Sequence, residues 1–116
     1  MQKFSASAIG VARGSSVMFS AFQDGGDMWT GHGPRAVRQP IRFAEPFRAA
    51  PLVQVAISMW DIDQQSNQRA DIAATEITRE GFTLVFKTWG DTRVARIRAD
   101  WLAIGPVAHE DGWEPV

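Results

Sequence analysis

Apolar and polar residues alternate along three stretches of the chain, residues 52–60, 82–89 and 95–104. Successive side chains of a β-strand point to opposite faces, so this period of two predicts three strands. The pattern places Trp60 on the opposite face from Met59. The side chains predicted to share one face are Val53, Val55, Ile57 and Met59, then Phe82, Leu84 and Phe86, and last Ile97, Ala99, Trp101 and Ala103.

Weaker strand signals flank these stretches. Residues 16–20 and 41–44 form short, mostly apolar segments. Residues 69–78 suit a strand or, because of their alanine content, a helix. Glu80-Gly81 follows at once and leads into the stretch at 82–89, which is typical of a hairpin turn and favours the strand.

Turn-forming residues separate the strands and decide the fold class. They predict a long irregular loop at 25–34, a polar connection at 61–67 and a tight turn at 89–92. Short strands at this spacing, with no convincing helix, predict an all-β protein with an antiparallel β-sandwich.

Length and charge narrow the range of functions. The 116 residues fit one domain, and the net charge of -1 with a pI of about 6.1 weighs against nucleic-acid binding and against an anionic-membrane partner. Arg93, Arg96 and Arg98 lie close together, but Asp91 and Asp100 nearby favour a solvated strand face over a basic patch. The chain has no cysteine, which excludes disulfides and thiolate chemistry.

The N-terminal segment lacks the features of a secretory signal. The residues after Met1 carry one lysine, and Gly10, Arg13 and Gly14 break any continuous apolar run. We expect a soluble protein without membrane insertion, whose localisation the sequence leaves open. An extracellular position would require a route other than the Sec pathway.

Catalytic chemistry is not favoured. The two histidines are His32, in the glycine-rich loop, and His109, in the C-terminal tail, and neither belongs to a nucleophile motif. A pair of carboxylates could in principle hydrolyse glycosides. The candidates for that alternative are Asp27, Asp61, Asp63 and Asp91.

The spacing Asp61-x-Asp63-x3-Asn67 invites a calcium interpretation. Gln65 and Ser66, however, stand where an EF-hand loop needs its third ligand and its glycine. We favour a turn in which Asp and Asn side chains accept backbone N–H groups. We therefore expect no metal and no cofactor.

The tryptophans point to a different kind of site. The chain has five tryptophans and no tyrosine. Trp101 lies on the apolar face of its strand and is predicted to be core, whereas Trp60 and Trp89 lie at strand ends beside loops. A tryptophan at a loop mouth can stack on a pyranose while nearby polar groups bond its hydroxyls. The alternative, that each simply caps the core, stays open on spacing alone.

Several short segments between residues 41 and 105 form an ordered set. They are Ile41-Arg42-Phe43, Pro46-Phe47, Pro51-x-Val53-x-Val55-x-Ile57, Asp61 with Asn67-x-Arg69, Gly81-Phe82, Thr88-Trp89-x-Asp91-Thr92-x-Val94 and Trp101-Leu102-Ala103-Ile104. The set resembles the H-type lectins, the family of the snail agglutinins and of the C-terminal domain of the slime-mould discoidins, whose pattern aligns with residues 41–105 without a gap. Residues 26–31 and 33–35 are similar to a bacterial branch of that family.

The resemblance implies a six-stranded antiparallel β-sandwich and a homotrimer, which in turn could pair into a hexamer. It implies sugar sites between subunits that favour galactose or N-acetylgalactosamine. Arg69 matches the arginine that bonds sugar hydroxyls, and Trp89 matches the tryptophan of the site. Asp91 and His32 are the further polar residues that we expect to contact the ligand.

Three positions depart from the family pattern. The snail lectins have a histidine where this chain has Gly90, and their tyrosine shortly afterwards falls on Ala95. Their site aspartate falls on His32, and the nearest acidic residue is Asp27. These departures put the galactosamine preference in question.

The sequence therefore predicts a lectin that binds glycans multivalently and functions, for example, in cell adhesion. The alternative is an assembly module, of an appendage or a phage-like particle, that keeps the trimer without binding sugar. We expect an N-terminal strand and loop segment at 1–35 that packs on the sandwich, the lectin-like sandwich itself at 36–106, and a tail at 107–116.

Overall fold

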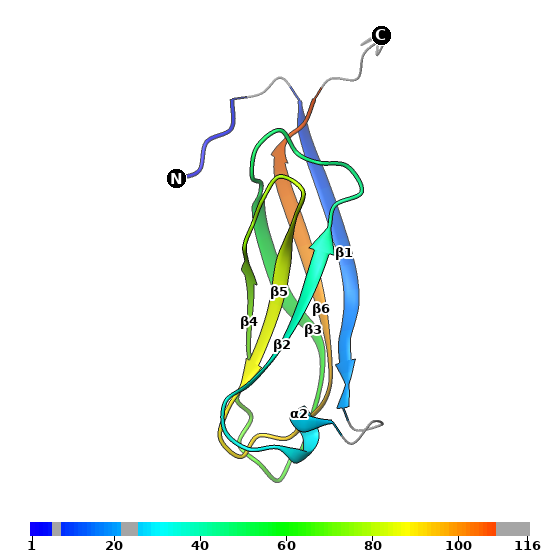
Figure 1. Ribbon diagram of the computed structural model, residues 1–116, viewed down its shortest axis with the longest axis vertical. Coiled ribbons are helices and arrows are strands. Elements are labelled where there is room, and N and C mark those ends of the chain that lie inside the picture. Colours follow the sequence, from blue (N-terminus) through cyan, green and yellow to red (C-terminus); the bar gives the residue numbers. More distant parts are fainter. Residues whose placement is uncertain (6–7, 22–25, 109–116) are drawn as a thin grey trace.

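Two three-stranded antiparallel sheets pack face to face in the computed structural model, which describes residues 1–5, 8–21 and 26–108 (Figure 1). The first sheet has the strand order β1-β6-β3 and the second has the order β2-β5-β4. The predicted all-β, six-stranded antiparallel sandwich is thus confirmed. The elements are β1 (Ile9–Ser20), α2 (Asp27–Thr30), β2 (Arg35–Arg42), β3 (Leu52–Ile62), β4 (Asp71–Thr75), β5 (Gly81–Thr88) and β6 (Val94–Pro106).

The strongest strand predictions and the ambiguous segment are all confirmed. Residues 82–88 and 95–104 lie in the central strands β5 and β6, and residues 71–75 form β4 rather than a helix. β4 pairs antiparallel with β5, so the Glu80-Gly81 turn joins a hairpin as predicted. The Thr78 amide donates to the Gly81 carbonyl at 2.9 Å inside that turn.

Strand β1 is longer than its predicted apolar core at 16–20. Its outward positions include Ile9 and Val11, which are exposed, whereas its inward positions include Gly10, Ala12 and Gly14. Because the large apolar side chains face outward and the small residues inward, the apolar pattern does not predict this part of the strand. Gly14 faces Trp101, and a Cβ at Gly14 would lie 2.6 Å from the indole ring. The small residue is therefore needed to admit the tryptophan.

A β-bulge corrects the predicted orientation of two residues in β3. The register with β6 shifts between Ile57 and Met59, so Met59 lies opposite Arg98 on the outer face of the sheet. Trp60 then lies opposite the buried Ile97. The predicted faces of Met59 and Trp60 are wrong, because one extra residue in a strand reverses the alternation beyond it. Trp60 does lie at a strand end, 62% exposed.

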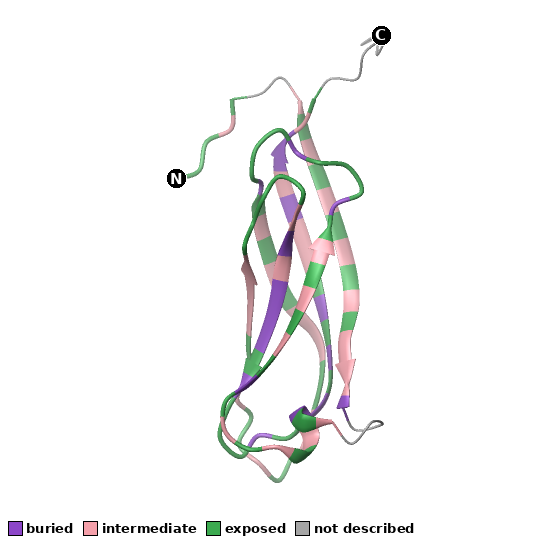
Figure 2. Ribbon diagram, viewed as in Figure 1, coloured by how far each residue is buried: buried purple, intermediate pink, exposed green. Residues whose placement is uncertain are grey.

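An aromatic cluster fills the sandwich towards the end that carries the chain termini. Phe43 has its ring centroid 5.0 Å from Phe47, 5.9 Å from Phe82 and 5.8 Å from Trp101. Trp101 is partly buried and packs against this cluster, which confirms its predicted place on the apolar face of the strand. Figure 2 shows that buried residues follow the central strands β5 and β6. A second cluster, nearer the opposite end, consists of Ala21, Met28, Phe86, Val94 and Ile97.

The polar connections are more ordered than predicted. The loop at 25–34 contains the one-turn helix α2, with Met28 buried in the second cluster. In the connection at 61–67, the Gln65 amide donates to the Asp63 carboxylate at 3.0 Å, which confirms the predicted Asp turn. No helix of the described residues is long and apolar enough to cross a membrane. His109 and residues 109–116 of the predicted tail lie outside the described residues.

The arginines of β6 and the turn before it have polar partners, so the predicted solvated strand face is confirmed. Arg96 pairs with Asp61 at 3.4 Å and Arg93 with Asp63 at 3.7 Å. Arg98 donates to the Ser58 hydroxyl at 3.0 Å. These partners offset the positive charge along the strand.

Candidate functional site

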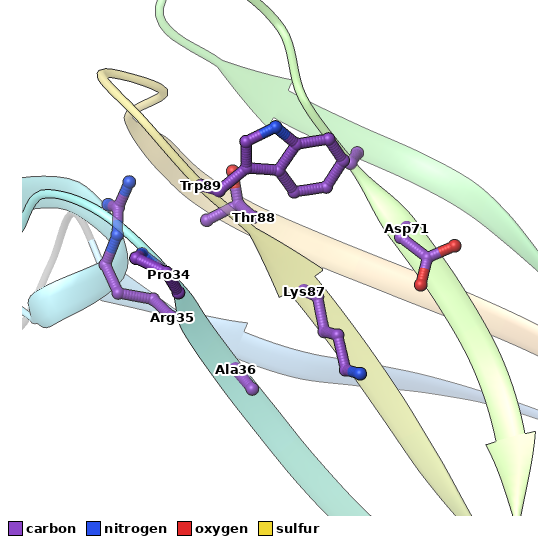
Figure 3. A pocket seen from close by; sticks show the side chains of 8 residues that line it. Pro34, Arg35, Ala36, Asp71, Lys87, Thr88 and Trp89 are labelled. Carbon is purple, nitrogen blue, oxygen red and sulfur yellow. The ribbon is translucent and has the colours of Figure 1, made fainter.

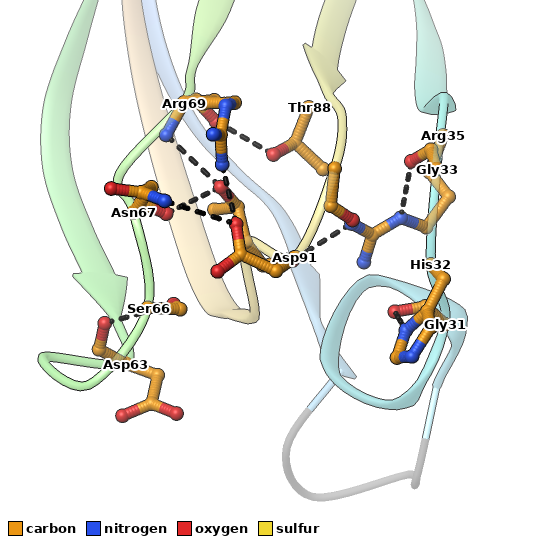
Figure 4. A network of polar contacts seen from close by, with 12 residues as sticks. Gly31, His32, Gly33, Arg35, Asp63, Ser66, Asn67, Arg69, Thr88 and Asp91 are labelled. Atoms are coloured by element: carbon orange, nitrogen blue, oxygen red, sulfur yellow. Dashed lines mark hydrogen bonds and ion pairs between the residues drawn. The ribbon is translucent and has the colours of Figure 1, made fainter.

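Three connections meet at the end of the sandwich opposite the termini: the α2–β2 loop, the β3–β4 connection and the β5–β6 turn (Figures 1 and 4). The Gly33 amide donates to the Gly90 carbonyl at 3.0 Å, which joins the first of these to the third. The buried Thr92 hydroxyl donates to the Asn67 carbonyl and accepts from the Arg69 amide, which joins the third to the second. We call this region the loop end.

Arg35, which sequence reasoning left without a role, holds the loop end together. The residue is 7% exposed, and its guanidinium has no carboxylate partner among the described residues. It donates instead to five backbone carbonyls, those of Asp27, Met28, Gly33, Gly90 and Thr92, at 2.8–3.3 Å. A planar fork of five N–H donors suits this task. The only sequence signal was an arginine flanked by Pro34 and a strand.

The two predicted polar residues Arg69 and Asp91 form an ion pair. The Arg69 Nη1 lies 2.5 Å from the Asp91 Oδ1, and the side chains are 33% and 58% exposed (Figure 4). The hydrogen bond from Arg69 lowers the pKa of Asp91 below its ordinary value of 3.8. Both side chains remain accessible to a ligand at neutral pH, and both are charged.

Gly90 lets Arg69 reach its partner. Its φ of +68° lies in the left-handed region, and a Cβ there would lie 3.1 Å from the Arg69 Nη1. The guanidinium thus occupies the space above Gly90. Where the snail lectins have a histidine, this chain therefore has a glycine with the Arg69 guanidinium packed over it. Ala95, a second departure, is 5% exposed.

His32 lies in the α2–β2 loop beside this network. Its ring is exposed, and Nδ1 lies 2.9 Å from the Gly31 carbonyl oxygen (Figure 4). A carbonyl only accepts, so this contact requires a hydrogen on Nδ1. The next residue, Gly33, is the one bonded to Gly90, so His32 shares the loop end with Arg69 and Asp91.

Trp89 stands at the edge of a groove on the outer face of the second sheet (Figure 3). The groove has a volume of about 530 Å³. The indole is 45% exposed and follows Thr88, whose side chain is buried at the end of β5. The residues lining the groove are Pro34, Arg35, Ala36, Ala70, Asp71, Lys87, Thr88 and Trp89.

The structure thus places all four predicted residues, Arg69, Trp89, Asp91 and His32, at one end of the molecule. Arg69 and Asp91 touch, Trp89 lies two residues before Asp91 in the same turn, and His32 lies in the adjoining loop. The residues that sequence reasoning missed are Arg35, Asn67, Asp71, Lys87, Thr88 and Thr92. Asn67 contacts Asp91 at 3.5 Å.

The fold and the site together define a lectin-like β-sandwich with an aromatic and charged site at its loop end. The family model of the H-type lectin domain matches residues 38–104. The chain belongs to the H-type lectin domain family, as the resemblance predicted.

Two relatives show how far the likeness extends. A protein of Fuscovulum blasticum, named ATP synthase subunits region ORF 7, is 57% identical over 107 residues, which are 92% of this chain and 93% of that protein. A discoidin-1 polypeptide of Dictyostelium discoideum is 33% identical over 96 residues, which are 75% of this chain. They are only 38% of the discoidin, so this chain corresponds to one part of it.

Solved structures share the fold. Discoidin II of Dictyostelium discoideum superposes with a TM-score of 0.75 and 24% identity, over 90% of this chain and 40% of that one. The tailspike protein gp49 of Pseudomonas phage LKA1 superposes with a TM-score of 0.53 and 17% identity, over 87% of this chain and 15% of that one. At these identities the likeness concerns the fold alone.

Proposed function

We propose that this chain is a carbohydrate-binding lectin whose site is the loop end. The single observation that carries the proposal is the half-exposed Trp89 indole, which lies along a groove and in the same turn as Asp91. Sugar sites combine one flat apolar platform with a few placed polar groups. Membership of the H-type lectin family supports galactose, N-acetylgalactosamine or a related glycan as the ligand.

In this proposal Arg69 and Asp91 bond the hydroxyls of a sugar that stacks on Trp89. A guanidinium has five N–H donors, and the contact with Asp91 uses one nitrogen, so other donors are left for a ligand. The Asp91 carboxylate, 58% exposed, is an acceptor. His32 can add a contact from the adjoining loop. A hydroxyl both donates and accepts, which suits a paired cation and anion.

The protein binds as an oligomer in the same proposal, because the otherwise polar outer face of the first sheet carries one exposed apolar row. Val11, Ile104 and Leu52 are cross-strand neighbours in one row of that sheet, and Val11 and Leu52 are 63% and 49% exposed. Exposed apolar patches of this kind mark contact surfaces. A trimer would present three sites, and such multivalency raises apparent affinity roughly 10²-fold or more where the spacing fits.

Hydrolysis by a carboxylate pair has less support. Asp61, Asp63 and Asp91 are each ion-paired with an arginine, at 3.4, 3.7 and 2.5 Å. A general acid needs a raised pKa, whereas the bond from Arg69 lowers the pKa of Asp91.

A glycan array tests the proposal, with Trp89→Ala and Trp60→Ala run beside the unaltered protein. Both tryptophans are exposed at strand ends, but only Trp89 lines the groove. We expect Trp89→Ala to abolish binding and Trp60→Ala to retain it. Equal loss in both variants would contradict the proposed site.

The second candidate is an assembly module that keeps the oligomer and binds no sugar. The exposed apolar row of the first sheet favours it as much as it favours a multivalent lectin. The phage tailspike shows that this fold occurs within a much longer chain. A stable trimer that is silent across the array would support this candidate over the lectin.

A further inference from the structure

We infer that the groove beside Trp89 holds a second sugar residue, so that the ligand is an oligosaccharide rather than a single terminal sugar. The inference rests on the proposed function, and it assigns Lys87 and Asp71 as the groups that bond the second residue. Neither residue belongs to the loops that carry Arg69 and Asp91.

The groove crosses the second sheet along one row of paired residues. Ala36 on β2 lies opposite Lys87 on β5, and Lys87 lies opposite Asp71 on β4. Neighbouring strands are about 4.8 Å apart, so the row spans roughly 10 Å. This is close to the length of a disaccharide and about twice the width of one pyranose ring. Trp89 stands at one edge of the row (Figure 3).

The chemistry of the row suits hydroxyl groups. Within the described residues the three ion pairs use other side chains, so Lys87 and Asp71 are not paired to each other or elsewhere. Both are exposed. The Lys87 ammonium has three donors and the ionised Asp71 carboxylate only accepts. Together they can bond two adjacent hydroxyls of one sugar ring.

Small residues make room for that ring. Pro34, Ala36 and Ala70 line the groove with short apolar side chains. Val85, which faces the same side one row further along β5, is only 1% exposed, so neighbouring side chains close the groove there. The hollow is therefore bounded, with apolar walls, a Trp89 edge and two unpaired charges.

The composition of the chain offers a direct test. Lys3 and Lys87 are the only lysines in the sequence. Reductive ¹³C-methylation keeps the lysine charge and gives each amine its own NMR signal. The full-length oligomer is titrated with methyl β-galactoside and with lactose, which ends in the same galactose. The indole N–H signal of Trp89, assigned with Trp89→Phe, is followed at the same time.

We expect both sugars to shift the Trp89 signal, and only lactose to shift the Lys87 signal, with Lys3 constant. If both sugars shift Trp89 and neither shifts Lys87, the second residue does not lie in the groove and the inference is overturned. If neither sugar shifts the Trp89 signal, the proposed galactose site is wrong. The inference, which depends on that site, is then wrong as well.

Variants give an independent measurement. Lys87→Met and Asp71→Ala should each reduce the affinity advantage of lactose over methyl β-galactoside about tenfold, the effect of losing a hydrogen bond to a charged group. The control is Arg42→Ala, an exposed charge at the other end of the same sheet, which should leave the ratio unchanged. An unchanged ratio in both groove variants would overturn the inference.

Discussion

The two ends of this sandwich are closed by different forces. Towards the termini, Phe43, Phe47, Phe82 and Trp101 pack ring against ring. At the loop end, the buried guanidinium of Arg35 and buried threonine hydroxyls bond to backbone carbonyls. The first end depends on area removed from water, which has no direction, whereas the second adds directed hydrogen bonds to its own apolar cluster.

This difference explains why the site lies where it does. Apolar packing tolerates small shifts, whereas a network of directed hydrogen bonds fixes the positions of the loops that it joins. Arg35 bonds the carbonyls of both Gly33 and Gly90, next to His32 and Trp89. We therefore expect substitutions at the aromatic end to change stability, and substitutions at the loop end to change binding as well.

The largest expected effect is that of Phe43→Ala. The side chain is 5% exposed and contacts three other aromatic rings. Its removal should lower the free energy of unfolding by about 3–5 kcal/mol, measured by urea denaturation. Glycan affinity of the protein that remains folded should not change. Val17→Ala, at an exposed position of β1, is the control and should stay within about 0.5 kcal/mol.

Arg35→Met should have the next largest effect, and it tests the loop end as Phe43→Ala tests the aromatic end. It leaves buried carbonyls without donors, which costs about 1–3 kcal/mol of unfolding free energy. Unlike Phe43→Ala, it should also reduce glycan affinity at temperatures where the protein is fully folded. Arg35→Lys, which retains the charge but not the planar fork, should recover stability better than affinity. Full affinity in Arg35→Met would show that the loops hold their positions without it.

A smaller effect is expected of Gly90→Ala, with Gly33→Ala as its matched control. Both glycines have positive φ, of +68° and +72°, so each substitution should cost about 1–2 kcal/mol of backbone strain. Only the Cβ at Gly90 meets another group, the guanidinium of Arg69, whereas the Cβ at Gly33 meets nothing within 4 Å. Gly90→Ala alone should therefore weaken glycan binding, and equal affinities in the two variants would contradict a role for the Arg69 position.

The strands were predictable where one face carries large apolar residues and the other polar ones. Phe82, Leu84 and Phe86 on β5 follow this rule, and their alternation predicts their burial. β1 does not follow it, because Gly14 faces inward to admit Trp101 and Val11 faces outward. A bulge such as that before Met59 has no signature in the alternation itself.

The candidate site was predictable only in part. Arg69 and Trp89 came from the resemblance to the family, and Asp91 lies in the same turn as Trp89. Arg35 was not predictable as a buried residue, because arginines are mostly exposed and its acceptors are backbone carbonyls, which every residue has. Lys87 and Asp71 become neighbours only through the β4–β5 register.

The smallest expected effect concerns pH and compares one carboxylate at the loop end with one on the first sheet. The bond from Arg69 lowers the pKa of Asp91, and bonds from the Ser15 and Ser58 hydroxyls lower that of Asp100, both from 3.8. A carboxyl with a lowered folded-state pKa contributes stability above about pH 3.8, and this is lost as the pH falls through the folded value. Asp91 therefore keeps its charge from pH 8 to about 5, and its contribution to glycan affinity should stay constant over that range.

Carboxyl ¹³C NMR titration of Arg69→Met separates the two groups. The pKa of Asp91 should rise towards 3.8, whereas that of Asp100 should keep its value because its serine partners are unchanged. Salt should weaken the Arg69–Asp91 pair, which is exposed, and so raise the pKa of Asp91 in the unaltered protein as well. If the pKa of Asp91 changes with neither the substitution nor the salt concentration, the pair does not persist in solution. Arg69 would then contact a sugar as an unpaired cation.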